Sequence, residues 1–103
     1  MLQIERTTTF KKCLKKFRHN KTVLGELEEV VELLINEKPI PDNYRDHELQ
    51  GNYKGIRELH LKPDDLLMYV KVERERIILM ALGSHSELFS NSKHSKNLKS
   101  TLR

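Results

Sequence analysis

Two periods of hydrophobic and polar residues run through this chain, and each predicts a different kind of element. Residues 2–6 alternate between apolar and polar side chains, which is typical of a short strand. In residues 8–20 and 22–38 the apolar side chains instead recur every three or four positions, which predicts two helices that each bury one face. The threonines at 7–9 suit the start of the first helix as N-caps. Because few residues separate the helices, we expect an antiparallel pair.

The second half of the chain predicts strands. Residues 39–54 contain prolines, a glycine and asparagines, and are expected to form a long loop. Segments 55–61, 65–72 and 76–82 have the composition of strands, and the links between them are short enough for hairpins. The last segment is continuously apolar, so we expect it at the centre of the sheet. The prediction is an α+β fold with an N-terminal strand, an antiparallel helix pair and a three-stranded antiparallel meander, in the order β-α-α-β-β-β.

Charge divides the chain in two. The net charge of +4 comes entirely from basic residues in 90–103, a segment made mostly of Ser, Asn, Lys and His. We therefore expect residues 1–89 to fold as one domain and residues 90–103 to form a basic, flexible tail. The domain itself has balanced charge, so net charge gives no argument for nucleic-acid binding. Its basic run from Arg6 to Lys21 could face phosphates, although such runs are more often solvated helix faces.

The chain lacks the features of a secreted or membrane protein. No apolar run is long enough to span a bilayer. The first residues lack the basic and then apolar pattern of a signal peptide. Cys13 is the only cysteine, so no disulfide framework can form within the chain. We therefore expect a cytoplasmic protein with no membrane partner.

Three histidines in polar surroundings are the strongest candidates for chemistry. His47 lies in the predicted loop, and His60 lies near the end of a predicted strand. His85 follows the last strand, where Ser84 is expected to cap a short turn. Alternation places His60 on the face opposite the buried leucines of its strand. Since the ends of neighbouring strands lie close together, the three imidazoles can share one site.

Such a group of histidines fits RNA cleavage by the RNA's own 2′-hydroxyl. Histidine takes and gives protons near neutral pH. The reaction needs a base for the 2′ proton, an acid for the leaving 5′ oxygen, and a cation for the charge that develops on the phosphate. Asp64, just beyond His60, is a second candidate base. The candidate cations are Lys54, Arg57 and Arg76.

Two other interpretations of the histidines stay open at this point. They can be unrelated surface residues, or they can bind zinc together with carboxylates. The chain has no His-x₃-His pair and no second cysteine, so zinc is the weaker alternative and no cofactor is predicted. Among the aromatic residues, Tyr53 and Phe89 can stack on RNA bases, whereas Tyr69 is expected in the core because it lies within a strand.

The segments around the histidines resemble one known family. The similarity covers residues 1–89 and rests on the order and spacing of four groups: Asp46-His47 with Leu49-Gln50-Gly51; Tyr53-Lys54-Gly55 with Arg57, His60, Pro63 and Asp64; Leu67 to Tyr69; and Gly83, His85 and Leu88-Phe89. In this pattern the chain resembles the YafQ branch of the RelE/ParE superfamily of bacterial type II toxins. The resemblance implies a RelE-like fold, an mRNA interferase that cleaves messenger RNA on the ribosome, and an antitoxin from the same operon.

The resemblance also implies which residues form the site. The active-site residues of the family match four positions here, with Phe89 at the edge of the site: His47, His60, Asp64 and His85. The residue after Asp64 is often tryptophan in these relatives, whereas here it is Asp65. This difference removes an aromatic ring and adds a negative charge beside the expected path of the phosphates.

From these positions we predict a metal-independent endoribonuclease. Asp64 or His60 is expected to remove the 2′ proton, His85 to protonate the leaving oxygen, and His47 to bind or polarise the phosphate. Two alternatives remain. ParE-type members share the fold but poison gyrase, and a relative without catalysis would only bind RNA or titrate the antitoxin. The set of histidines argues against the gyrase poison, which has no nuclease site.

Overall fold

A mixed five-stranded sheet organises the part of the chain that the structure describes, residues 1–89. The predicted flexible tail, 90–103, lies outside these residues. In this computed structural model the strands are β1 (Gln3–Arg6), β2 (His47–Glu48), β3 (Arg57–Lys62), β4 (Asp65–Val72) and β5 (Arg76–Gly83). They lie in the sheet in the order β1-β5-β4-β3-β2.

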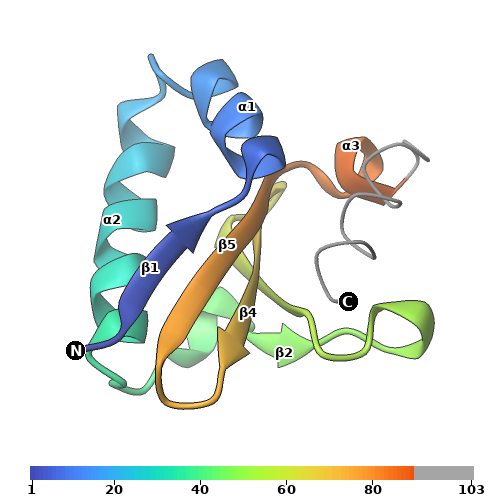
Figure 1. The fold of residues 1–103 in the computed structure, drawn as a ribbon. Helices are drawn as coiled ribbons and strands as arrows, with labels where there is room; N and C mark the ends of the chain where they lie inside the picture. Colours follow the sequence, from blue (N-terminus) through green and yellow to red (C-terminus); the bar gives the residue numbers. More distant parts are fainter. Residues whose placement is uncertain (90–103) are drawn as a thin grey trace.

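The predicted antiparallel meander is confirmed. β3 pairs with β4 and β4 pairs with β5, both antiparallel. β5 lies between β4 and β1, as its continuous apolar run predicted, and β1 pairs with it in parallel (Figure 1). The N-terminal strand therefore closes one edge of the sheet, and the α+β class is confirmed.

The prediction of a simple loop at 39–54 was wrong in part. This segment contains β2 and two single-turn 3₁₀ helices, η1 (Asp42–Tyr44) and η2 (Gly51–Tyr53). β2 pairs antiparallel with β3 and forms the other edge of the sheet. Two residues are too few to show the alternation that predicts a strand. As a consequence, His47 lies in a strand whose register is fixed by β3.

Two helices cover one face of the sheet, and they run in opposite directions in Figure 1: α1 (Thr8–Lys16) and α2 (Lys21–Ile35). The predicted threonine cap of α1 is present, because Thr7 Oγ1 accepts from the Phe10 amide at 2.9 Å. Asn20 Oδ1 accepts from the Val23 amide at 3.1 Å and starts α2 in the same way. α1 ends earlier than predicted, since Phe17 already leaves the helical conformation.

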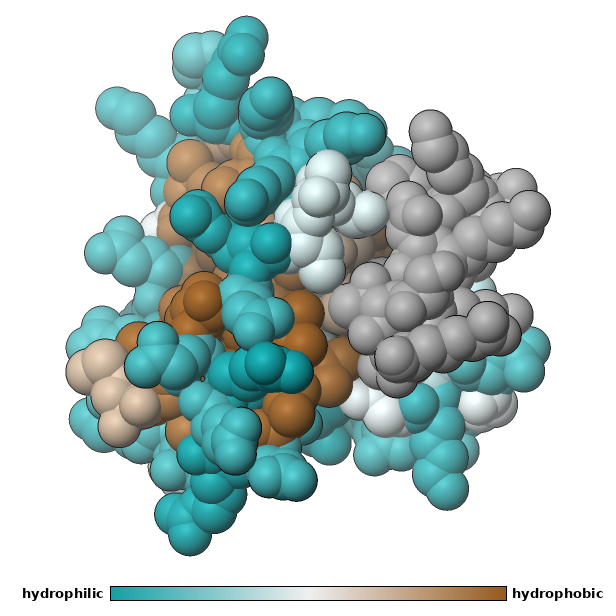
Figure 2. All heavy atoms as spheres, in the orientation of Figure 1, coloured by the Kyte–Doolittle hydropathy of each residue, from teal (hydrophilic) through white to brown (hydrophobic). Residues whose placement is uncertain are grey.

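The core lies between these helices and the sheet. Phe10 of α1, Val30 of α2, Leu59 of β3 and Ile77 of β5 each expose 1% of their surface or less. Burying side chains of this size stabilises a fold by about 1.5–3 kcal/mol each. Tyr69 is 2% exposed, which confirms its predicted place in the core. On the face shown in Figure 2, hydrophobic surface over β1 and β5 is bordered by hydrophilic side chains.

The end of the described chain is a short helix, α3 (His85–Phe89). The predicted Ser84 cap is confirmed and is reciprocal. Ser84 Oγ accepts from the Glu87 amide at 3.2 Å, and Glu87 Oε1 accepts from the Ser84 amide at 3.0 Å. Within residues 1–89, no helix is long and apolar enough to cross a membrane.

Candidate active site

Glu58 lies at the centre of the candidate site. It belongs to β3, and the antiparallel register places it directly opposite His47 of β2. Glu58 Oε2 lies 3.1 Å from His47 Nε2, and Glu58 Oε1 lies 3.9 Å from His85 Nε2. The Glu58 side chain is only 4% exposed. A buried carboxylate is unfavourable without cationic or hydrogen-bonding partners. His47 lies within hydrogen-bond distance of Oε2, whereas Oε1 faces His85 and has no hydrogen bond within the described residues.

Both ring nitrogens of His47 face acceptors. Nδ1 lies 2.6 Å from the carbonyl oxygen of Arg45, and Nε2 lies 3.1 Å from the Glu58 carboxylate. A neutral imidazole has one N–H, whereas the imidazolium has two. Only a doubly protonated ring can donate to both acceptors at once. These two contacts fix the orientation of His47 although half of its side chain is exposed.

His60 lies beside His47 on the same side of the sheet. The two rings are stacked, with centroids 6.4 Å apart. As alternation predicted, His60 is partly exposed while Leu59 is buried. His60 Nδ1 lies 3.4 Å from the carbonyl oxygen of Pro63. A proton on Nδ1 satisfies that contact and leaves Nε2 as a free acceptor, which is the tautomer that a general base needs.

Asp64 and Asp65 follow in the turn between β3 and β4. Asp64 is exposed and makes no side-chain hydrogen bond or ion pair with any residue in 1–89, so the structure does not join it to His60 directly. Burial, followed by the charges of Asp64 and Glu87, raises the pKa of Asp65. The residue that replaces the family's frequent tryptophan is therefore a partly buried carboxylate in a negative environment.

His85 is carried into the cluster by α3. Its ring lies against Phe89, with centroids 4.4 Å apart, and Phe89 in turn meets Tyr53 edge to face at 5.5 Å. The His85 side chain is 69% exposed, the most open of the three imidazoles that the structure groups together. Tyr53 and Phe89 thus form an aromatic wall beside the most accessible imidazole.

Arg57, a predicted substrate-binding cation, is not part of this cluster. Its Nε and Nη2 both donate to the Asp46 carboxylate at 3.2 Å, and Tyr69 donates to the same carboxylate at 2.7 Å. Burial alone would lower the pKa of Arg57, but Asp46 and Tyr69 outweigh it and raise that pKa. Arg57 lines a different pocket with Leu34 of α2, on the face that the helices cover. Adjacent residues of a strand point to opposite faces, so Glu58 and Arg57 cannot share a site.

The other two candidate cations differ in position. Arg76 begins β5, and the other end of that strand, which His85 follows, lies roughly 23 Å away at the rise of an extended chain. Arg76 also pairs with Glu5 at 3.0 Å. Lys54 is exposed, follows Tyr53 at the end of η2, and has no ion pair within the described residues. Of the three cations, Lys54 is therefore the one next to the aromatic wall.

Sequence reasoning gave no role to Glu58, the residue that joins the histidines. Alternation did place Glu58 on the same face as His60, and that was the available signal. The face was interpreted as open to solvent, because its cover depends on β2 and α3. Only the strand pairing of His47 and the position of His85 show that this carboxylate is buried.

Comparison with known proteins identifies the family. The sequence profile of a family described as a bacterial toxin of a type II toxin–antitoxin system, YafQ, matches residues 2–90. This chain belongs to the YafQ family. The resemblance found in the histidine segments is thereby confirmed by a match that spans nearly all of the described residues.

Individual YafQ relatives agree with this assignment. The mRNA interferase toxin YafQ of Escherichia coli K12 is 34% identical over 87 residues, covering 84% of this chain and 94% of that protein. The structure of a metal-bound toxin from Helicobacter pylori covers 86% of this chain and 100% of its own, with 47% identity and a TM-score of 0.79. The DinJ–YafQ complex of E. coli contains a chain that is 33% identical, with 86% and 99% coverage and a TM-score of 0.75. These likenesses confirm the predicted fold of the YafQ-like domain.

Proposed function

We propose that this YafQ-family chain is an mRNA interferase, a metal-independent endoribonuclease that cleaves messenger RNA on the ribosome by 2′-hydroxyl attack. The observation that carries the proposal is the arrangement of His47 and His85 around the buried Glu58, with His60 stacked beside His47. Acid–base groups are thus gathered on one open side of a rigid sheet. The activity carried in the name of the E. coli relative, mRNA interferase, agrees with that chemistry.

The geometry favours one division of roles. His60 acts as the base, because the contact of its Nδ1 with Pro63 leaves Nε2 free to take the 2′ proton. Asp64 is the weaker alternative, since it has no contact that would fix it in place. His85 acts as the acid, because it is the most exposed imidazole and is held beside an aromatic wall.

His47 and Lys54 supply positive charge in this proposal. Both ring nitrogens of His47 already face acceptors, the Arg45 carbonyl and the Glu58 carboxylate. His47 therefore stabilises the phosphate by its charge and not by a direct hydrogen bond. Lys54, exposed beside Tyr53, is the candidate for direct contact with a phosphate oxygen.

Metal independence follows from the substrate. The attacking oxygen is the 2′-hydroxyl of the RNA itself, so no water has to be activated. Such a reaction leaves a 2′,3′-cyclic phosphate on one product and a 5′-hydroxyl on the other. The product ends therefore distinguish this mechanism from a metal-activated hydrolysis.

The partner in this proposal is an antitoxin, as in the E. coli DinJ–YafQ complex. A groove of about 460 Å³ between α1 and α2 is lined by Leu14 and Leu24 with Lys11, Lys15 and Arg18. An acidic amphipathic segment of the antitoxin fits its apolar floor and cationic rim. Charge reversal at the cations of this rim, Lys11, Lys15 and Arg18, should weaken a co-purified complex more at low salt than at high salt. If the wild type and the charge-reversed variant bound the antitoxin equally well, the antitoxin would bind another surface of the fold.

Inducible expression in a bacterial host tests the function as a whole. We expect the toxin to act in the cytoplasm, so that the cells stop growing when new 5′ ends appear in a reporter mRNA. Primer extension should map these ends to the translated region. The same induction should leave plasmid supercoiling unchanged. Altered supercoiling with an intact reporter would instead support a gyrase-poisoning toxin.

A further inference from the structure

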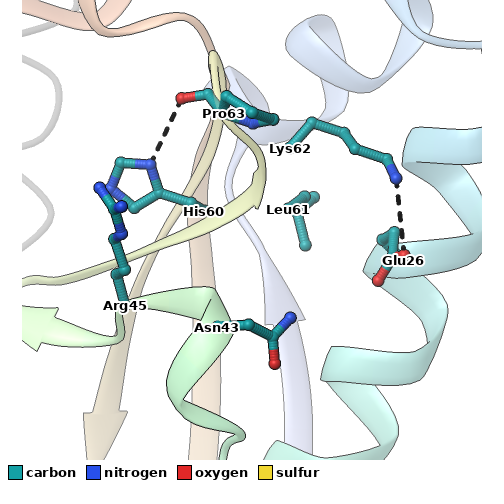
Figure 3. Close-up of a pocket in the computed structure, with 7 residues that line it drawn as sticks. All are labelled: Glu26, Asn43, Arg45, His60, Leu61, Lys62 and Pro63. Atoms are coloured by element: carbon teal, nitrogen blue, oxygen red, sulfur yellow. Dashed lines mark hydrogen bonds and ion pairs between the residues drawn. The ribbon is translucent and has the colours of Figure 1, made fainter.

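A second cavity adjoins the histidine cluster and shares one residue with it. It has a volume of about 350 Å³ and is lined by His60, the turn after β3, η1 and the side chain of Glu26 from α2 (Figure 3). A cavity of this size is within the range of small-ligand sites. The pairing of β3 with β4 is irregular between His60 and Lys62. Lys62 extends toward Glu26, while His60 lies on the other side of the cavity in Figure 3.

One of the cationic side chains that line the cavity, Arg45, has no acidic partner within residues 1–89. Lys62 Nζ lies 3.7 Å from Glu26 Oε1, and Tyr44 donates to Glu26 Oε2 at 2.5 Å. Both oxygens of the lining carboxylate are therefore already used. Hydrogen bonding to Glu26 raises the pKa of Tyr44 to about 12, so the phenol stays protonated as its donor. The remaining charged group is Arg45, which has no ion pair within residues 1–89.

Arg45 connects this cavity with the histidine cluster. Its backbone is left-handed, with φ of 52° and ψ of 42°, a conformation that residues with side chains seldom adopt. In this conformation the Arg45 carbonyl accepts from His47, while the side chain extends toward His60 in Figure 3. Strained backbone of this kind is often found where function requires it. Asn43 also lines the cavity, its side chain extends toward the α2 side in Figure 3, and its amide makes no hydrogen bond within residues 1–89.

We propose that this cavity is a nucleotide subsite for the RNA residue next to the scissile bond. The Arg45 guanidinium binds the phosphate of that nucleotide, since its planar donors match phosphate oxygens in pairs. The Asn43 amide, with both donors and an acceptor, hydrogen-bonds to the base edge. This inference rests on the proposed ribonuclease function, because it needs RNA to pass His60. It adds a second contact region that contributes to binding and base preference but takes no part in proton transfer.

The test measures the binding of short 2′-O-methyl RNA, which lacks the attacking hydroxyl, by fluorescence anisotropy over a range of salt concentrations. Arg45→Gln should weaken binding about tenfold at low salt and reduce the slope of log K against log salt by about 0.7, the loss of one phosphate contact on a single strand. Arg45→Lys should keep the slope. Asn43→Ala should change the preferred base and leave the slope as it is.

Arg74→Gln is the matched control. Arg74 is an exposed arginine in the turn between β4 and β5, at the other end of β5 from His85, so the same charge change there should alter neither affinity nor slope. All Arg45 variants retain the backbone carbonyl that holds His47, and equal thermal midpoints would show that they are folded. An unchanged slope in Arg45→Gln, or the same loss in Arg74→Gln, would overturn the subsite.

Two further outcomes separate the subsite from the wider function. If the wild type cleaves unmodified RNA and Arg45→Gln binds 2′-O-methyl RNA as well as the wild type, only the subsite is refuted. If the wild type neither binds nor cleaves RNA, the proposed function and the subsite are refuted together. Polyglutamate serves as an acidic-peptide probe. Weaker polyglutamate binding by Arg45→Gln with unchanged RNA binding would assign the cavity to a protein partner and overturn the proposal.

Discussion

His47 and Glu58 face each other across the antiparallel pair of β2 and β3, with 3.1 Å between Nε2 and Oε2. One member of this pair is half exposed and the other is almost fully buried. The pair therefore connects the interior of the sheet with the surface where RNA would bind. The position of His47 depends on the register between β2 and β3.

Glu58→Gln should reduce cleavage more than it reduces stability. Glutamine keeps the shape and one acceptor of the side chain but removes the negative charge that His47 and His85 face. We expect the cleavage rate to fall by about 10²-fold and the free energy of unfolding to fall by about 1–3 kcal/mol. Single-turnover cleavage and urea unfolding measure the two effects. Glu48→Gln, an exposed glutamate of the same strand pair, is the control. Full activity in Glu58→Gln would refute its role in positioning His47.

His60→Ala and His85→Ala should each relieve growth arrest in cells that express the folded protein. Loss of a general base or acid lowers a rate by about 10²–10⁴-fold. His19→Ala is the matched control, because His19 is exposed and its described contact is with the neighbouring Arg18. Growth curves and circular dichroism check the outcome. Undiminished toxicity of both variants would contradict the assigned chemistry.

Arg57→Ala should lower the free energy of unfolding and leave RNA binding unchanged. Asp46 accepts from Arg57 and Tyr69, and removing the arginine leaves that carboxylate with a single neutral donor. We expect unfolding to become easier by about 1–3 kcal/mol. The salt dependence of RNA binding should stay the same, because this guanidinium lies on the opposite face from His60. A reduced salt slope would show that Arg57 contacts phosphate after all.

Asp65 should make the fold less stable as the pH rises. Its pKa is raised in the folded chain by burial, Asp64 and Glu87, so the unfolded chain loses this proton first. The ionised form then favours unfolding at every pH above the folded pKa, and the penalty disappears when Asp65 is protonated. Asp65→Asn should therefore raise the thermal midpoint by a few degrees, about 1–4 °C, at neutral pH. Near pH 3 the two proteins should melt alike, and a stabilisation that is equal at both pH values would assign the effect to another cause.

Local periodicity predicted most of the fold because most elements bury one clear face. The two long helices, the caps at Thr7 and Ser84 and the three long strands follow from spacing and capping residues. The Asn20 cap of α2 was not predicted. The pairing of β1 with β5 brings together opposite ends of the chain, and no local pattern encodes such a contact. β2 was missed for the opposite reason, since two residues form too short a pattern. Its place in the sheet is set by pairing with β3.

The sequence predicted the three histidines of the candidate site but not Glu58, the carboxylate at its centre. His47, His60 and His85 carry chemistry that residue type alone reveals. Glu58 gains its importance from burial, and that burial arises only when β2 and α3 approach β3. Arg57 shows the converse. A cation near a histidine in sequence lies on the opposite face of the strand and is bonded to Asp46.

The chemistry of the RNA ends after cleavage tests the central claim most directly. Purified toxin is incubated with unmodified RNA in excess EDTA, and the fragments are analysed by mass spectrometry, with ribosome integrity controlled separately where ribosomes are present. The account predicts cleavage that persists in EDTA and yields 2′,3′-cyclic phosphate, or the 3′-phosphate formed from it, opposite a 5′-hydroxyl. His85→Ala should yield about 10²–10⁴-fold less of the same product. Fragments with 3′-hydroxyl ends, or activity that EDTA abolishes while the RNA and ribosomes stay intact, would contradict it.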